Sequence, residues 1–134
     1  MTDARRERIL TAADELTKGM ADNDVEGLGR LYSSDAVIWH NTDRREVSVG
    51  ELLEVVKVLN AVATGSVVVD ERQVTDFGFV QAQTATYRFS SGEEAQVQVA
   101  MFAWVDDEGK ITRLNEYVDS VALAPLIAAL GGGD

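Results

Sequence analysis

Apolar residues recur at helical spacing in three segments of the first half of the chain, with charged residues on the remaining faces. The first helix is predicted over residues 3–21. A shorter second helix, capped by the polar residues after the first, extends to Tyr32. The third helix begins at a capping box formed by Ser48 and Glu51 and extends to Val62. Amphipathic helices of this kind need a common apolar surface to cover.

The spacing of apolar residues changes to strict alternation in the second half of the chain. Strands are predicted over residues 36–41, 67–74 and 79–89, and a hairpin is predicted over residues 95–119. Pro125 suits the first turn of a short final helix that ends at Gly131. Helices followed by a run of strands are typical of an α+β fold in which the helices cover one sheet face. No linker or repeat divides residues 1–134, so we expect a single domain.

The hairpin over residues 95–119 contains a candidate catalytic group, the carboxylate of Glu116. With a loop of two or four residues at the acidic turn 106–109, Val99 pairs with Glu116 and Met101 pairs with Leu114. Side chains alternate along a strand, so one face then carries Val97, Val99, Met101, Ala103, Thr112, Leu114, Glu116 and Val118. Glu116 is the only charged group on that face, and a carboxylate buried without a partner is costly. A three-residue loop would shift the pairing by one residue and expose Glu116.

The sequence of the strand predicted over residues 79–89 indicates open space beside Glu116. The turn at residues 90–93 sets three small side chains next to the hairpin, with Ala82 beside Met101, Thr84 beside Val99 and Thr86 beside Val97. Small side chains on one sheet face favour a pocket over a solid core. The earlier strand over residues 36–41 places Ile38 and His40 on one face.

The opposite face of the hairpin is aromatic. It carries Phe102, Trp104 and Tyr117. Large aromatic side chains on an outer sheet face more often form a subunit interface than a ligand platform, so we expect a homodimer through this face.

Charge and composition narrow the choice of partners. The chain of 134 residues has a formal net charge of −11, which opposes binding to nucleic acid or to an anionic membrane surface. The absence of cysteine excludes disulfides and thiolate metal sites. The acidic run at residues 106–108 lacks the further ligands that a metal loop needs. The N-terminus has no signal-peptide pattern and no segment reaches membrane-spanning length, so we expect a cytoplasmic protein.

The run NDVEGLGRLYSSDAVIWHN and the ending GKITRLNEYVDSVALAPL resemble the nuclear transport factor 2-like superfamily. Within it, the resemblance is to the SnoaL-like branch, which includes polyketide cyclases, steroid isomerases and limonene epoxide hydrolases. It implies a cone-shaped α+β barrel, with three N-terminal helices packed on a strongly curved sheet. That sheet is mixed but mainly antiparallel, and a short C-terminal helix follows it. Many reactions and some non-catalytic roles share this fold.

The resemblance also implies roles for individual residues. His40 matches the position of the general base of the steroid isomerases, and Glu116 matches a catalytic carboxylate of the epoxide hydrolases. The oxyanion-hole positions of the isomerases correspond to Leu16 and Met101, which do not donate such hydrogen bonds. The Arg-x-Asp pair of the epoxide hydrolases has no counterpart between residues 66 and 105.

We therefore expect a small-molecule-binding pocket in which His40 and Glu116 are the catalytic pair. The chemistry would be that of an isomerase, cyclase or hydrolase acting on an apolar polyketide-, terpenoid- or steroid-like substrate. The residues expected to contact the substrate are Tyr32, Ile38, Val99, Met101, Leu114 and Val118. No cofactor or metal is implied. The alternative is a non-catalytic ligand-binding or dimerisation module, with His40 as a core histidine bonded to a backbone carbonyl.

Overall fold

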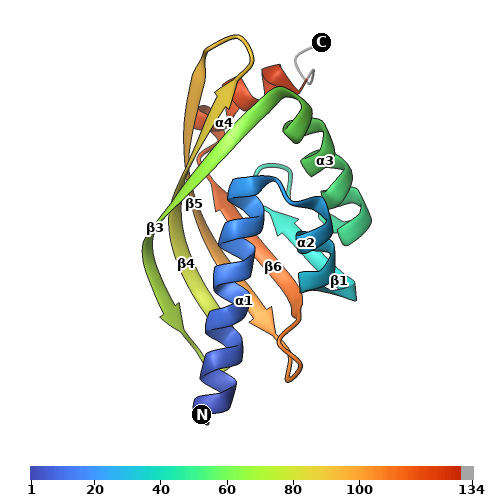
Figure 1. The fold of residues 1–134 in the computed structure, drawn as a ribbon, viewed down its shortest axis with the longest axis vertical. Helices are drawn as coiled ribbons and strands as arrows, with labels where there is room; N and C mark the ends of the chain where they lie inside the picture. The colour runs from blue at the N-terminus through green and yellow to red at the C-terminus, as the bar shows by residue number, and fades with distance from the viewer. Residues whose placement is uncertain (131–134) are drawn as a thin grey trace.

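The computed structural model describes residues 1–130, which form four helices and six strands (Figure 1). The helices are α1 (Asp3–Asp22), α2 (Val25–Leu31), α3 (Val49–Val62) and α4 (Ser120–Ala129). The strands are β1 (Tyr32–His40), β2 (Glu46–Ser48), β3 (Ala63–Val74), β4 (Gly78–Phe89), β5 (Glu94–Val105) and β6 (Ile111–Val118). The predicted α+β class is confirmed. Strand β2 was not predicted, because three residues are too few to show alternation.

The strands form one curved, open sheet in the order β2-β1-β6-β5-β4-β3 (Figure 1). Strands β3 to β6 follow one another as an antiparallel meander. Strand β1 joins the far side of β6 and runs parallel to it. This parallel pairing brings His40 into register with Glu116, although the two residues are far apart in the sequence.

The helices cover the concave face of the sheet (Figure 1). Helix α1 contacts β3 and β4, α3 contacts β1, and α4 contacts β5. The largest fully buried side chains beneath them include Ile9, Leu16, Ile38, Phe79, Met101, Ile111 and Leu114. In the described part of the chain, no helix has the length and apolar character needed to cross a membrane.

Short polar side chains begin the helices, as the sequence predicts for α3. The Ser48 hydroxyl accepts a hydrogen bond from the backbone N–H of Glu51 at 3.2 Å. The Asp119 carboxylate caps α4 by accepting from the N–H of Val121 at 3.0 Å. Helix α4 therefore begins earlier than predicted and contains Pro125 in its interior. Its predicted end at residue 131 lies outside the described residues.

The loop of the β5–β6 hairpin differs from the predicted one. Asp106 pairs with Lys110 through the hydrogen bond from Asp106 N to Lys110 O (2.9 Å), which leaves a loop of three residues. Gly109 occupies the left-handed position of that loop at φ +83°. A bulge next to Trp104 and Val105 then displaces the register by one further residue.

The two displacements together preserve the predicted faces of the hairpin. Met101 pairs with Glu116 rather than with Leu114, so the predicted pairs are wrong by two residues. Because alternation has a period of two, Glu116 stays on the buried face. The bulge changes one position: Ile111, which is fully buried, takes the place predicted for Thr112.

The β4–β5 hairpin differs from its predicted pairing by one residue, which exchanges the faces of β4. The backbone N–H of Phe89 donates to the carbonyl of Glu93 at 2.8 Å, and Gly92 at φ +91° lies within the three-residue loop. Val99 therefore pairs with Gln83. The inner face of β4 carries Phe79, Gln81, Gln83, Ala85 and Tyr87. The prediction that the small residues Ala82, Thr84 and Thr86 occupy this face is therefore wrong.

At Gly78 the backbone of β4 lies too close to the backbone of β5 to leave room for a side chain. A Cβ at this residue would lie 2.0 Å from the carbonyl oxygen of Ala103, so the backbone must move to admit a side chain. We expect Gly78→Ala to lower the free energy of unfolding by about 3 kcal/mol, measured by urea denaturation.

The control for this change is Gly50→Ala in α3, where a Cβ would meet only the Ser48 hydroxyl oxygen at 3.8 Å. We expect this variant to match the wild type or to gain up to about 1 kcal/mol from helix propensity. Equal unfolding midpoints for Gly78→Ala and the wild type would contradict the close approach of the two strands.

Candidate functional site

A cavity of about 260 Å³ lies between the concave face of the sheet and the helices. Apolar side chains form most of its wall, among them Met20, Leu52, Val56, Leu59, Val97 and Leu123. Val55 of α3 and Ile127 of α4 line the cavity and are also exposed to solvent. The cavity therefore reaches the surface of the protein near residues of these helices.

The structure places most of the sequence-predicted site residues at this cavity. The residues that line it are Tyr32, His40, Val99, Glu116 and Val118. Three further residues predicted to contact substrate, Ile38, Met101 and Leu114, are buried in the core and do not line the cavity. Their side chains belong to the main hydrophobic core, together with those of Ile9 and Leu16 of α1.

His40 and Glu116 form an ion pair on the wall of the cavity. The distance from His40 Nε2 to Glu116 Oε2 is 3.4 Å. Glu116 is only 7% exposed, whereas His40 is half-buried. The parallel register of β1 and β6 sets the two residues side by side, and both side chains lie on the concave face. His40 is thus paired with a side-chain carboxylate rather than with a backbone carbonyl.

Asn41 holds the end of β1 against β6 and so fixes this pair. Its backbone N–H donates to the carbonyl of Glu116 at 3.1 Å. Its side-chain Nδ2 donates to the carbonyl of Val118 at 3.2 Å, and its Oδ1 accepts from the N–H of Val118 at 2.8 Å. This role was not predicted from the sequence, in which Asn41 was only the polar last residue of the strand predicted over residues 36–41.

The pKa values of three groups near Glu116 are raised. The hydrogen bond to Glu116 raises the pKa of His40 above its usual value; desolvation opposes this, and the charges of Glu116 and Asp43 add to it. Burial, with a smaller contribution from Glu116, raises the pKa of Tyr87 to about 12. The same two causes raise the pKa of Tyr32. Both tyrosines therefore stay neutral and keep their hydroxyl protons.

Four polar residues of the wall were not predicted from the sequence: Asn23, Thr42, Gln83 and Tyr87. The last two have a common cause. Both lie on β4, and the one-residue error in the β4–β5 pairing assigned them to the outer face. A three-residue loop ending in Gly92 would have been the signal for the correct register. Within residues 1–130, no three histidine, aspartate or glutamate side chains gather closely enough to hold a metal ion.

No family model matches the sequence, and no curated protein matches it significantly. Solved structures do match. PrhC from Penicillium brasilianum NBRC 6234 is similar with a TM-score of 0.83 and 12% identity, over 96% of this chain and 91% of that one. An LEH-like epoxide hydrolase from M. tuberculosis gives a TM-score of 0.74 and 15% identity, over 96% of this chain and 98% of that one.

A third similar structure comes from Shewanella denitrificans OS-217 and is described as a candidate SnoaL-like polyketide cyclase. Its TM-score is 0.75 at 11% identity, over 90% of this chain and 97% of that one. These similarities confirm the resemblance to the SnoaL-like branch of the nuclear transport factor 2-like proteins at the level of the fold. Identities this low carry no information about the reaction.

Because the pKa of His40 is raised, the stability that its pairing with Glu116 contributes should depend on pH. The folded-state pKa lies above the unfolded value of about 6.5, so the pair stabilises the folded state fully below that pH. This stabilisation is lost as pH rises through the higher folded-state pKa. We expect His40→Gln to be more destabilising at pH 5.5 than at pH 9, measured by urea denaturation.

The control is the same substitution in a Glu116→Gln background, which removes the carboxylate but keeps its shape. There the effect of His40→Gln should vary little with pH, because the charged partner is gone. A wild-type effect that stays constant from pH 5.5 to 9 would mean that the two side chains do not interact in solution.

Proposed function

We propose that this chain, which has the fold of SnoaL-like proteins, binds an apolar small molecule in its cavity and performs acid–base chemistry on it with His40 and Glu116. The observation that carries this proposal is a carboxylate–imidazole pair on the wall of a largely apolar cavity. Perturbed ionisable groups that converge in a concave, apolar site are typical of active sites.

Stability alone does not account for the pair. Removing a carboxylate and an imidazolium from water costs free energy that their mutual attraction only partly offsets. Apolar residues at both positions would suit the surrounding core at least as well. A pair of charged groups that is costly to bury and faces a cavity is better explained by a role toward a ligand.

The two side chains can act as complementary acid and base. In the charged pair, the Glu116 carboxylate accepts a proton from an activated carbon or from a water molecule. Protonated His40 donates a proton to an oxygen on which negative charge develops. Proton transfer between the two groups, across the 3.4 Å that separates Nε2 from Oε2, restores the starting state. This cycle serves an isomerisation, a cyclisation or a hydration.

The test uses 2-acetylnaphthalene, an apolar ketone with exchangeable methyl hydrogens, as the probe. We expect the protein to accelerate deuterium exchange of these hydrogens in D2O, because a base in the cavity removes a proton next to the carbonyl. Glu116→Gln should lower the accelerated rate by about 100-fold, within the usual range for a general base. Nuclear magnetic resonance measures the exchange, and equilibrium dialysis measures the affinity for the probe.

The matched control is Glu94→Gln, which neutralises a half-exposed carboxylate on β5 outside the cavity and should leave the exchange rate unchanged. Binding of the probe without accelerated exchange would contradict the catalytic role and leave a non-catalytic binding module. Absence of any binding would contradict the role of the cavity as well.

A second proposal concerns the outer face of the sheet, which we infer to be a homodimer interface. The ring of Tyr117 lies 5.3 Å from that of Trp39 and 6.1 Å from that of Phe102, measured between centroids. Phe102 and Tyr117 are 39% and 46% exposed. An exposed aromatic cluster of this kind favours self-association, and an isologous contact would bury it in both copies.

We expect the wild type to have twice the 14.6 kDa chain mass by light scattering at micromolar concentration, and Phe102→Glu to be a monomer. The substitution places a charge at the centre of the contact, where it would be buried without a partner. Val68→Glu on β3 is the control, because Val68 is 62% exposed and lies outside the aromatic cluster. A monomeric wild type would rule out the interface.

A further inference from the structure

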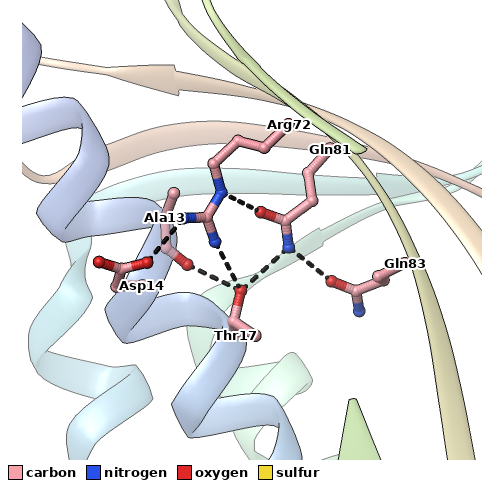
Figure 2. Close-up of polar contacts among 6 residues, drawn as sticks. All are labelled: Ala13, Asp14, Thr17, Arg72, Gln81 and Gln83. Atoms are coloured by element: carbon pink, nitrogen blue, oxygen red, sulfur yellow. Dashed lines mark hydrogen bonds and ion pairs between the residues drawn. The ribbon is translucent and has the colours of Figure 1, made fainter. Parts of the chain in front are cut away.

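A chain of hydrogen-bonded side chains runs from the surface of α1 to the cavity (Figure 2). Arg72 donates from Nη1 to Asp14 Oδ1 at 2.6 Å and from Nε to Gln81 Oε1 at 2.7 Å. Gln81 in turn donates from Nε2 to Gln83 Oε1 at 2.8 Å. Gln81 and Gln83 are each only 1% exposed, and Gln83 lines the cavity.

This chain fixes the direction of both amides. A guanidinium offers only donors, so the amide oxygen of Gln81 must face Arg72. The Gln81 nitrogen then faces Thr17 Oγ1, at 2.9 Å, and the oxygen of Gln83. The Gln83 nitrogen consequently points away from Gln81, as Figure 2 shows.

The outward nitrogen of Gln83 is poorly matched by its surroundings. Its one partner in the described residues is the thioether sulfur of Met20 at 3.8 Å, and thioethers are weak acceptors. A buried amide N–H without a good acceptor is unfavourable relative to water. Packing of α1 on the sheet explains Gln81, which bonds on both sides, but it gives no reason for the outer end of Gln83.

We propose that Gln83 recognises the ligand by donating a hydrogen bond from its amide nitrogen to a carbonyl oxygen of an apolar molecule in the cavity. Arg72 and Gln81 are positioning residues, which act only through Gln83. The guanidinium charge at the outer end also polarises the two amides and strengthens the final donor. This inference rests on the proposed function, since it requires a ligand in the same cavity.

The ligand class follows from the chemistry of the donor. The Gln83 oxygen faces Gln81 and accepts its hydrogen bond, so the end of the amide that is left for a ligand is the nitrogen with its N–H groups. A ketone or ester carbonyl accepts a hydrogen bond without needing to donate one, and it replaces the weak sulfur contact.

One ligand can reach both Gln83 and Glu116. The two residues lie on the strands that flank β5, and their partners on β5, Val99 and Met101, are two residues apart. Strand spacing and rise put their Cα atoms about 12 Å apart, so one bound molecule can contact both.

The experiment compares two probes of the same shape, 2-acetylnaphthalene and 2-isopropenylnaphthalene, which carries a C=CH2 group in place of the carbonyl. We expect the wild type to bind the ketone about tenfold more tightly, the difference expected for one hydrogen bond in a dry site. Gln83→Leu should bring the affinity ratio to about one. Equilibrium dialysis measures both affinities.

Two further readouts separate recognition from a structural effect. The carbonyl stretching frequency of the bound ketone should be lower in the wild type than in Gln83→Leu, because a hydrogen bond weakens the C=O bond. Arg72→Leu should also reduce the affinity ratio, although Arg72 does not reach the cavity, because the amides lose their fixed direction. The matched controls are Gln98→Leu and Arg88→Leu, which replace exposed side chains of β5 and β4 and should retain the preference.

The outcomes distinguish this inference from the proposed function. If the wild type binds both probes equally well, Gln83 has no recognition role and the proposed function stands. If the ketone preference survives Gln83→Leu but is lost in Tyr32→Phe or Tyr87→Phe, a tyrosine is the donor and the inference is overturned. If neither probe binds, the cavity takes no such ligand and both proposals fail. The affinity ratio of the wild type needs no variant, so a folding defect in Gln83→Leu does not obscure that result.

Discussion

The parallel pairing of β1 with β6 is the contact on which the His40–Glu116 pair depends. Neither His40 nor Glu116 is placed by its own strand alone, because each strand only fixes which face its side chains occupy. The hydrogen bonds between Asn41 and the β6 backbone hold the two strands at the register where imidazole and carboxylate meet. A shift of β1 by one residue would turn His40 outward and leave Glu116 buried without a partner.

Among the polar groups in the largely apolar wall of the cavity, two differ in character. The His40–Glu116 pair carries charge and can exchange protons, whereas the amide of Gln83 is neutral and held in one direction by Arg72 and Gln81. The first arrangement suits chemistry and the second suits recognition. Both reduce the apolar contact that the core could otherwise make, as is common where function and stability compete. The fold supplies the cavity, and these side chains give it a character that the fold alone does not specify.

Much of the fold could be predicted from the periodicity of the chain. The change from helical spacing to alternation separates the helices from the strands, and capping residues such as Ser48 mark where helices begin. Burial of Glu116 was also predicted, because Leu114 and Val118 share its face of the strand and are apolar. His40 was identified by its place at the end of a strand and by family resemblance. Periodicity alone could not establish the partnership between the two residues, since it requires a parallel pairing that no local pattern encodes.

The lengths of the hairpin loops determined the strand register, which the alternation of apolar and polar residues does not specify. In the β5–β6 hairpin, a three-residue loop and a bulge each displaced the register by one residue, and their sum returned Glu116 to the predicted face. In the β4–β5 hairpin a single displacement was not compensated, so Gln83 and Tyr87 lie inside where small residues had been predicted. The sequence by itself therefore determined the elements and the apolar character of their faces. Only the tertiary structure decided which face of β4 lines the cavity and which strand meets β6. The reason is physical: a side-chain period of two turns one residue of loop geometry into a reversal of the whole strand.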